Sequence, residues 1–218
     1  MQSRASALVM GIVLGLAFFA AAWAVAPEPV GYVTRIQGIA RARPAEPPDA
    51  APRPLGLGKP VHAGDHLATE ADTRLEIRLR NGVMVTLGER TEFTVQAAPA
   101  AGDDRAQGTL MDLTRGVFRA ITPKAATEIP APLQVRTSMA VIGIRGTDFW
   151  GGFQFQPGAL DVVMLAGKGV YVETPAGRVE LTVPGEGTTV ADPAQPPAPP
   201  KSWPAAKLRA AQDSVAWR

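Results

Sequence analysis

Apolar and polar side chains alternate in short runs along most of the chain, which is the period of a β-strand with one buried face. Residues 75–79 and 83–87 form two such runs, with Leu, Ile or Val at every second position. A two-residue turn between them would split the two apolar sets between opposite faces. A three-residue loop ending in Gly82 instead pairs Leu79 with Val83. The pattern therefore predicts a hairpin closed by a type I turn and a left-handed Gly82.

The alternation recurs in short β-branched runs at residues 162–166, 170–174 and 178–183. Turns containing glycine or proline separate these runs, which together predict a meander of neighbouring strands. Residues 44–54 and 97–108 are rich in Pro, Ala or Asp and are predicted to be surface loops. Because long helical periodicity is scarce, we expect one all-β domain, either an antiparallel sandwich or a coiled, solenoid-like arrangement of short strands.

The two ends of the chain differ from this β region. Arg4 precedes an uncharged apolar run over residues 5–26, and Ala22-Trp23-Ala24 is a small-x-small pattern suited to cleavage before Val25. The run is also long enough, at ~20 residues, for an uncleaved helical membrane anchor. With either outcome, the body of the protein is expected outside the cytoplasm.

The C-terminal end is rich in proline over residues 193–204, a composition that favours extended, solvated backbone and is not expected to add to a core. Beyond it, Leu208, Ala211 and Val215 lie at helical spacing, but a helix this short is marginal alone. A disordered end is the favoured interpretation, and a docking helix is the alternative. The expected organisation is a signal peptide or anchor at 1–26, a β domain at 27–192 and a Pro-rich tail at 193–218.

Charge and composition exclude several classes of protein. The formal net charge is only +2, which is too balanced to indicate a nucleic-acid-binding protein. The chain contains no cysteine, so it has no disulfide framework, no thiolate nucleophile and no cysteine-based metal site. No cofactor is implied.

One segment places a permanent cation in an apolar, strand-like run. Arg145 lies between Gly143 and Gly146, and a guanidinium cannot lose its charge, so burial there requires carboxylate or carbonyl acceptors. Asp148 is the nearest candidate. A bulge at Gly146 would bring Arg145 and Asp148 to one face of the sheet.

Residues 135–149 resemble the hallmark V-x-T-P-x-A-x-x-G-V-R-G-T-E-F of the FecR domain family, with Ser138 in place of proline and Asp148 in place of glutamate. Residues 57–69 are similar to its G-x-x-V-x-x-G-D-x-L-x-T segment, and further matches in the family's order extend over residues 30–190. The positions that carry the resemblance are Gly64, Asp65, Gly82, Gly143, Arg145, Gly146, Thr147, Asp148 and Phe149.

The resemblance implies a function in recognition. Members with the full architecture pass a periplasmic contact with an outer-membrane receptor to a cytoplasmic sigma factor. In this chain only residues 1–4 would lie in the cytoplasm, so we expect a stand-alone periplasmic module without the cytoplasmic anti-sigma domain. Its expected partner is an envelope protein, and an envelope glycan such as peptidoglycan or lipopolysaccharide is the alternative.

Several residues suggest other chemistry. His62 and His66 are four residues apart, but the apparent turn at Gly64 argues against the helix that would bring both to one metal ion, and both are expected in an exposed loop. Asp65 is expected to order that turn through backbone N–H groups. Ser138 has no nucleophile elbow around it, so serine hydrolysis is not expected.

Asp148 and Asp161 flank a segment rich in glycine and aromatic residues, and such a pair could serve a hydrolase acting on a sugar. Core packing explains the phenylalanines of this segment more simply, which leaves Trp150 as the aromatic whose exposure would indicate a binding role. Arg74, Arg78 and Arg80 are expected on the polar face of one strand, either solvated or available to an anionic headgroup. We therefore expect a protein that is not an enzyme, with a hydrolase as the least favoured alternative.

Overall fold

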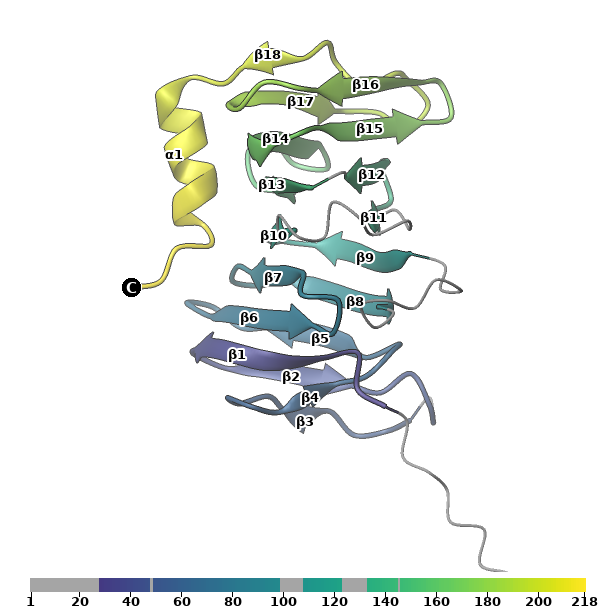
Figure 1. Cartoon of the computed structure of the whole chain (residues 1–218), viewed down its shortest axis with the longest axis vertical. Helices are drawn as coiled ribbons and strands as arrows, with labels where there is room; N and C mark the ends of the chain where they lie inside the picture. The colour runs from purple at the N-terminus through teal and green to yellow at the C-terminus, as the bar shows by residue number, and fades with distance from the viewer. Residues whose placement is uncertain (1–27, 48, 99–107, 123–132, 145) are drawn as a thin grey trace, which may run out of the picture.

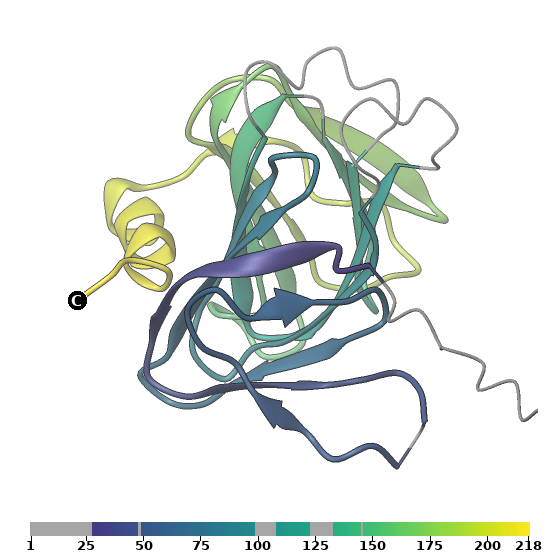
Figure 2. The same cartoon turned by 60° about the horizontal axis from the view of Figure 1, so that its bottom comes forward.

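The computed structural model of the chain describes residues 28–47, 49–98, 108–122, 133–144 and 146–218. Within these residues, eighteen strands form two nine-stranded sheets that pack face to face, and one helix lies beside them (Figures 1 and 2). The predicted all-β fold is confirmed. The predicted signal or anchor at residues 1–26 lies outside the described residues. Within the described part of the chain, no helix is both long enough and apolar enough to span a bilayer.

The chain crosses repeatedly between the two sheets, so that strands are added to both sheets in the same direction along the stack. All neighbouring strands are antiparallel except β9 and β11, which are parallel. In spatial order, sheet I consists of β18 (Lys201–Ser202), β17 (Glu186–Val190), β14 (Leu160–Gly167), β13 (Thr147–Gly152), β10 (Val117–Ile121), β7 (Met84–Leu87), β6 (Arg74–Leu79), β1 (Gly31–Gln37) and β4 (Pro60–Val61). Sheet II consists of β16 (Gly177–Leu181), β15 (Val170–Thr174), β12 (Val141–Ile144), β11 (Leu133–Arg136), β9 (Thr109–Arg115), β8 (Glu92–Ala97), β5 (His66–Thr69), β2 (Ala40–Arg43) and β3 (Arg53–Pro54).

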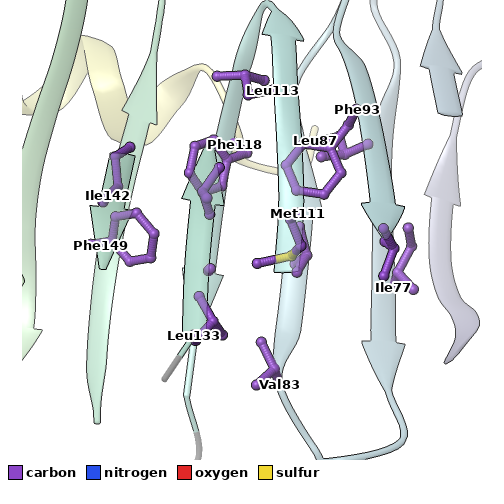
Figure 3. Close-up of a cluster of buried hydrophobic side chains, with 14 of the residues drawn as sticks. Ile77, Val83, Leu87, Phe93, Met111, Leu113, Phe118, Leu133, Ile142 and Phe149 are labelled. Atoms are coloured by element: carbon purple, nitrogen blue, oxygen red, sulfur yellow. The ribbon is translucent and has the colours of Figure 1, made fainter. Parts of the chain in front are cut away.

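The core lies between the sheets, where the alternating apolar positions of both sheets meet. Figure 3 shows these side chains on successive strands. Phe118 on β10 packs against Phe93 on β8 and Phe149 on β13, with ring centroids 5.6 and 5.3 Å apart. All three rings are fully buried. Burial of such large apolar surfaces is the main driving force that holds the two sheets together.

The predicted hairpin is present as β6 and β7. The Leu79 amide donates to the Val83 carbonyl at 2.8 Å, and Ile77 pairs with Val85. Gly82 has a φ of 84°, the left-handed conformation that the three-residue loop requires. The predicted register and turn are therefore confirmed.

The predicted meander is correct for its last two strands, because β15 and β16 pair as antiparallel neighbours, and wrong for its first strand. β14 pairs with β13 and β17 in sheet I, whereas β15 pairs with β12 and β16 in sheet II. The turn after β14 changes sheets at Gly167, whose φ is 115°. Residues 44–54 also differ from the predicted loop, because β3 at their end pairs with β2.

The Pro-rich segment is ordered, and the expectation that it adds nothing to a core is wrong. The Ala198 amide donates to the Thr189 carbonyl at 3.0 Å, and the Thr174 hydroxyl donates to the Gln195 carbonyl at 2.9 Å. The segment therefore connects β17 of sheet I with β15 of sheet II, at the C-terminal end of the stack that the two sheets form. After it, α1 (Ala205–Asp213) runs along the stack beside sheet I (Figures 1 and 2).

Candidate interaction surface

The segment around Arg145 connects the two sheets instead of forming one bulged strand, which corrects the prediction. Residues 141–144 are β12 of sheet II, and residues 147–152 belong to β13 of sheet I. Gly146, with a φ of 56°, lies at the crossing and redirects the backbone. Arg145 itself lies outside the described residues.

Asp148 is held by a neighbouring strand. Both of its carboxylate oxygens accept hydrogen bonds from Arg119 on β10, Oδ1 from Nε at 2.8 Å and Oδ2 from Nη2 at 2.6 Å. This hydrogen bonding raises the pKa of Arg119, against the opposing effect of burial. A bidentate carboxylate of this kind joins two strands and is not a free general base. The pairing of Asp148 with Arg145 stays a prediction.

Other positions of the family resemblance also have structural roles. The Thr147 hydroxyl donates to the Gly169 carbonyl at 2.8 Å and so fixes the turn between β14 and β15. A Cβ on Gly143 would overlap the ring of Tyr171, its partner across the sheet. Phe149 is fully buried in the core. These side chains shape the fold and offer no exposed reactive group.

Asp65 orders its turn as predicted. It is 2% exposed, and its Oδ2 accepts from the His62 amide at 2.8 Å and from Arg53. Gly64 has a φ of 80° at the same turn. The prediction of an exposed loop is wrong in part for both histidines: His62 lies in the turn but its side chain is only 28% exposed, and His66 lies on β5, where its side chain is 31% exposed and Nε2 is 3.9 Å from Glu92.

The two candidate carboxylates do not form a catalytic pair. Asp161 lies opposite Gly152 on β13, four residues from Asp148, which corresponds to ~13 Å along a strand. Glycosidase carboxylates are roughly 5–9.5 Å apart. Asp161 is 1% exposed, and its Oδ1 accepts from Lys207 and from Thr189, both at 2.6 Å.

Trp150 is fully buried, so it does not offer the binding surface that its exposure would have indicated. The C-terminal segment covers it: Trp150 Nε1 donates to the Ser214 hydroxyl at 2.9 Å, and the Trp203 ring centroid lies 6.0 Å away. Lys207 of α1 lies over the rings of Trp203 and Phe155 at 4.1 and 4.9 Å. These aromatic residues therefore form the surface on which α1 packs.

The three arginines of β6 and its turn do not form one exposed row. Arg74 is 3% exposed, because the end of α1 covers it, and it donates to the Thr73 carbonyl at 2.8 Å. Arg80 pairs with Glu28, and Arg78 is exposed. The predicted headgroup site is thereby reduced to Arg78 and Arg80.

Sheet II has an outer face lined mainly by polar side chains, which we call the open face. Its outward side chains contact one another across strands. Asp112 accepts from Arg136 at 2.7 Å, and the Arg178 guanidinium lies 3.8 Å from the centroid of the Tyr171 ring. The hydrogen bonds from Arg136 and Gln96 lower the pKa of Asp112, although burial alone would raise it. The open face comprises Asp112, Gln134, Arg136, Tyr171, Glu173 and Arg178.

Sequence reasoning missed the pairing of Arg119 with Asp148, the role of Lys207 and the open face. The alternation shows that Gln134, Arg136 and Tyr171 point away from the core, but it does not show which strands are neighbours. Residues 113–119 resemble the family's L-x-x-G-x-x-R pattern, which ends at Arg119 but does not identify its partner. Lys207 carries no signal of its own, since it is one charge on a polar position.

Comparisons with known proteins support the family resemblance. The family model described as FecR protein matches residues 65–169. Two crystal structures described as a candidate anti-sigma factor from Parabacteroides distasonis ATCC 8503 share the fold, each with 19% identity and a TM-score of 0.53. The likeness covers 66% of this chain and 62% or 63% of theirs, so it spans less than two thirds of those chains. A search of curated proteins found no significant match.

Proposed function

Because residues 65–169 are a FecR domain, we propose that the protein is a non-enzymatic recognition or scaffold module that binds another protein in envelope signalling or assembly. Matching FecR domains are regulatory, and this chain shares the fold of a candidate anti-sigma factor. A binding function requires an accessible surface rather than a reactive group.

The open face is the observation that carries the proposal. It carries four charged side chains together with Gln134 and Tyr171, and the Arg136–Asp112 contact holds two of these charges in place. Tyr and Arg are enriched in protein interfaces because both combine apolar area with directional hydrogen bonds. Sheet I, in contrast, has α1 over part of its outer face.

The side chains that suggested catalysis or glycan binding have structural roles within the fold. Asp148 is bound by Arg119, and Asp161 is bound by Lys207. Ser138 lies in a tight turn in which the Thr137 hydroxyl accepts from the amides of residues 139 and 140. The burial of Trp150 removes the stacking platform on which a glycan site was based.

We place the protein in the periplasm on the basis of its N-terminal sequence. Arg4, the apolar run at 5–26 and Ala22-Trp23-Ala24 support export. Fractionation followed by N-terminal sequencing tests this, with Val25 expected as the mature N-terminus of the periplasmic protein. An intact Met1 in the membrane fraction would indicate an anchor, and recovery in the cytoplasm would refute the placement.

Site-specific photo-cross-linking in cells tests the proposed function. A cross-linking residue at Glu173, on the open face, is expected to capture a discrete protein partner. The matched control is Arg78, which is also exposed on a strand but lies on sheet I. Capture from Arg78 alone would place the interface elsewhere. Glycan recovered in place of protein at both positions would refute a protein partner.

A further inference from the structure

A pocket of about 770 Å³ lies where the end of α1 meets the turns at one edge of the stack. In Figure 1, α1 ends at the level of β10, and the C-terminus lies beside β7. The lining comes from the start of β6, the turn between β9 and β10, and the C-terminal residues. Its charged residues are Arg74, Glu89, Arg90, Arg115, Asp213 and Arg218.

Arginines outnumber carboxylates in this lining, four to two. Three of the arginines have acidic neighbours at the surface: Arg90 has Glu89 at 3.5 Å, Arg115 has Glu92 at 2.9 Å, and Arg218 has Asp72 at 3.0 Å. These three side chains are 64–69% exposed. Exposed pairs are weak, and one contact leaves most of the five guanidinium donors available.

Arg74 is different because it is buried. It donates to the carbonyls of Thr73 and Asp213, and no described carboxylate forms an ion pair with it. Its Nε has no hydrogen-bond partner within the described part of the chain. Burial lowers its pKa, and the nearby charge of Glu89 only partly opposes this. A buried cation without a carboxylate in direct contact is unfavourable, so an anion beside it would be stabilised.

We infer that this pocket binds a small oxyanion, a carboxylate or a phosphate, between Arg74, Arg90 and Arg218. The planar guanidinium fork matches the geometry of both groups. Because Arg218 belongs to the C-terminal segment and Arg90 to the turn after β7, a bound anion connects the segment to the stack. The inference goes beyond the proposed protein-binding function and does not depend on it.

Calorimetric titration of the full chain with inorganic phosphate, and separately with succinate, tests the inference at constant ionic strength. Saturable binding is expected for at least one probe. Arg90 has a φ of 50°, a conformation that favours glycine, so Arg90→Gly should leave the melting temperature equal or higher. The same variant should weaken binding about tenfold, because one charged hydrogen bond contributes on that order.

The matched control is Arg43→Ala, which removes an exposed arginine of β2 outside the pocket lining and should leave the affinity unchanged. Three results would overturn the inference: heats that do not saturate, an Arg90→Gly protein that binds like the parent, or equal losses in both variants. The last result would mean that overall charge, and not this pocket, attracts the anion.

Discussion

At the scale of single residues, the positions that carry the family resemblance have structural explanations. Gly143 is a glycine because the Tyr171 ring occupies the space above it, an arrangement in which an aromatic side chain covers the glycine of a neighbouring strand. The sequence marked Gly143 as a motif position. It could not show this reason, because Tyr171 is distant in the chain and the strand pairing was unknown.

Gly143→Ala is expected to destabilise the protein by about 1–3 kcal/mol, the typical cost of overpacking. Combining it with Tyr171→Ala should give less than the sum of the two single effects, because the second change removes the clash. Urea unfolding measures all three variants. The control is Gly169→Ala, whose Cβ would lie 3.6 Å from its nearest neighbour. Equal costs at Gly143 and Gly169 would contradict the explanation.

The two bidentate arginine–aspartate pairs should contribute unequally to the stability of the protein. Arg119 and Asp148 are 35% and 18% exposed, whereas Arg136 is 48% exposed beside Asp112. Arg119→Ala is expected to cost about 1–2 kcal/mol, because a partly buried carboxylate loses two charged hydrogen bonds. Arg136→Ala should cost less than about 1 kcal/mol. Thermal unfolding at low and high salt compares them, and a larger effect at Arg136 would contradict this order.

At the scale of elements, the sequence predicted the register of a local hairpin but not which sheet each strand joins. The β6–β7 hairpin depends on apolar alternation and one glycine, so its register was predictable. The β14–β15 connection has the same local signals, yet it changes sheets. Alternation identifies the buried face of a strand but not its neighbours, and the choice of sheet depends on packing across the core.

The C-terminal segment depends on one aromatic anchor. Trp203 is 6% exposed, its ring lies on Gly187, and it contacts Trp150 and Phe155. Trp203→Ala is therefore expected to cost about 3–5 kcal/mol in the free energy of unfolding.

Trp217→Ala is the matched control, because that ring is only partly buried and its recorded contact is Arg35, 4.2 Å from its centroid. We expect it to cost about 0.5–1 kcal/mol. Denaturant unfolding measures both variants. A Trp203 effect as small as that of Trp217 would show that the segment is only loosely attached.

At the scale of the whole molecule, the C-terminal segment connects levels of the stack that are far apart in sequence. Its contacts run from Gly185 beside β17, through Asp161 on β14, to Arg74 on β6. The Arg218 amide reaches Gln37 of β1 at 3.1 Å. The segment was expected to be disordered because its proline content indicates only the local preference of the backbone. Docking depends instead on the apolar surface that strands distant in the sequence provide.

Truncation after Pro200 should therefore lower the melting temperature, since it exposes Trp150, Val117 and Val163, which now lie in one apolar cluster with the segment. The loss should amount to several kcal/mol, as for other removals of large buried side chains. Trp150 becomes solvated, so the tryptophan emission of the truncated protein should shift to longer wavelength. Truncation after Ala216 is the control: it removes only Trp217 and Arg218, and should leave Trp150 buried. If truncation after Pro200 left the melting curve and the emission of Trp150 unchanged, the C-terminal segment would not be part of the folded unit.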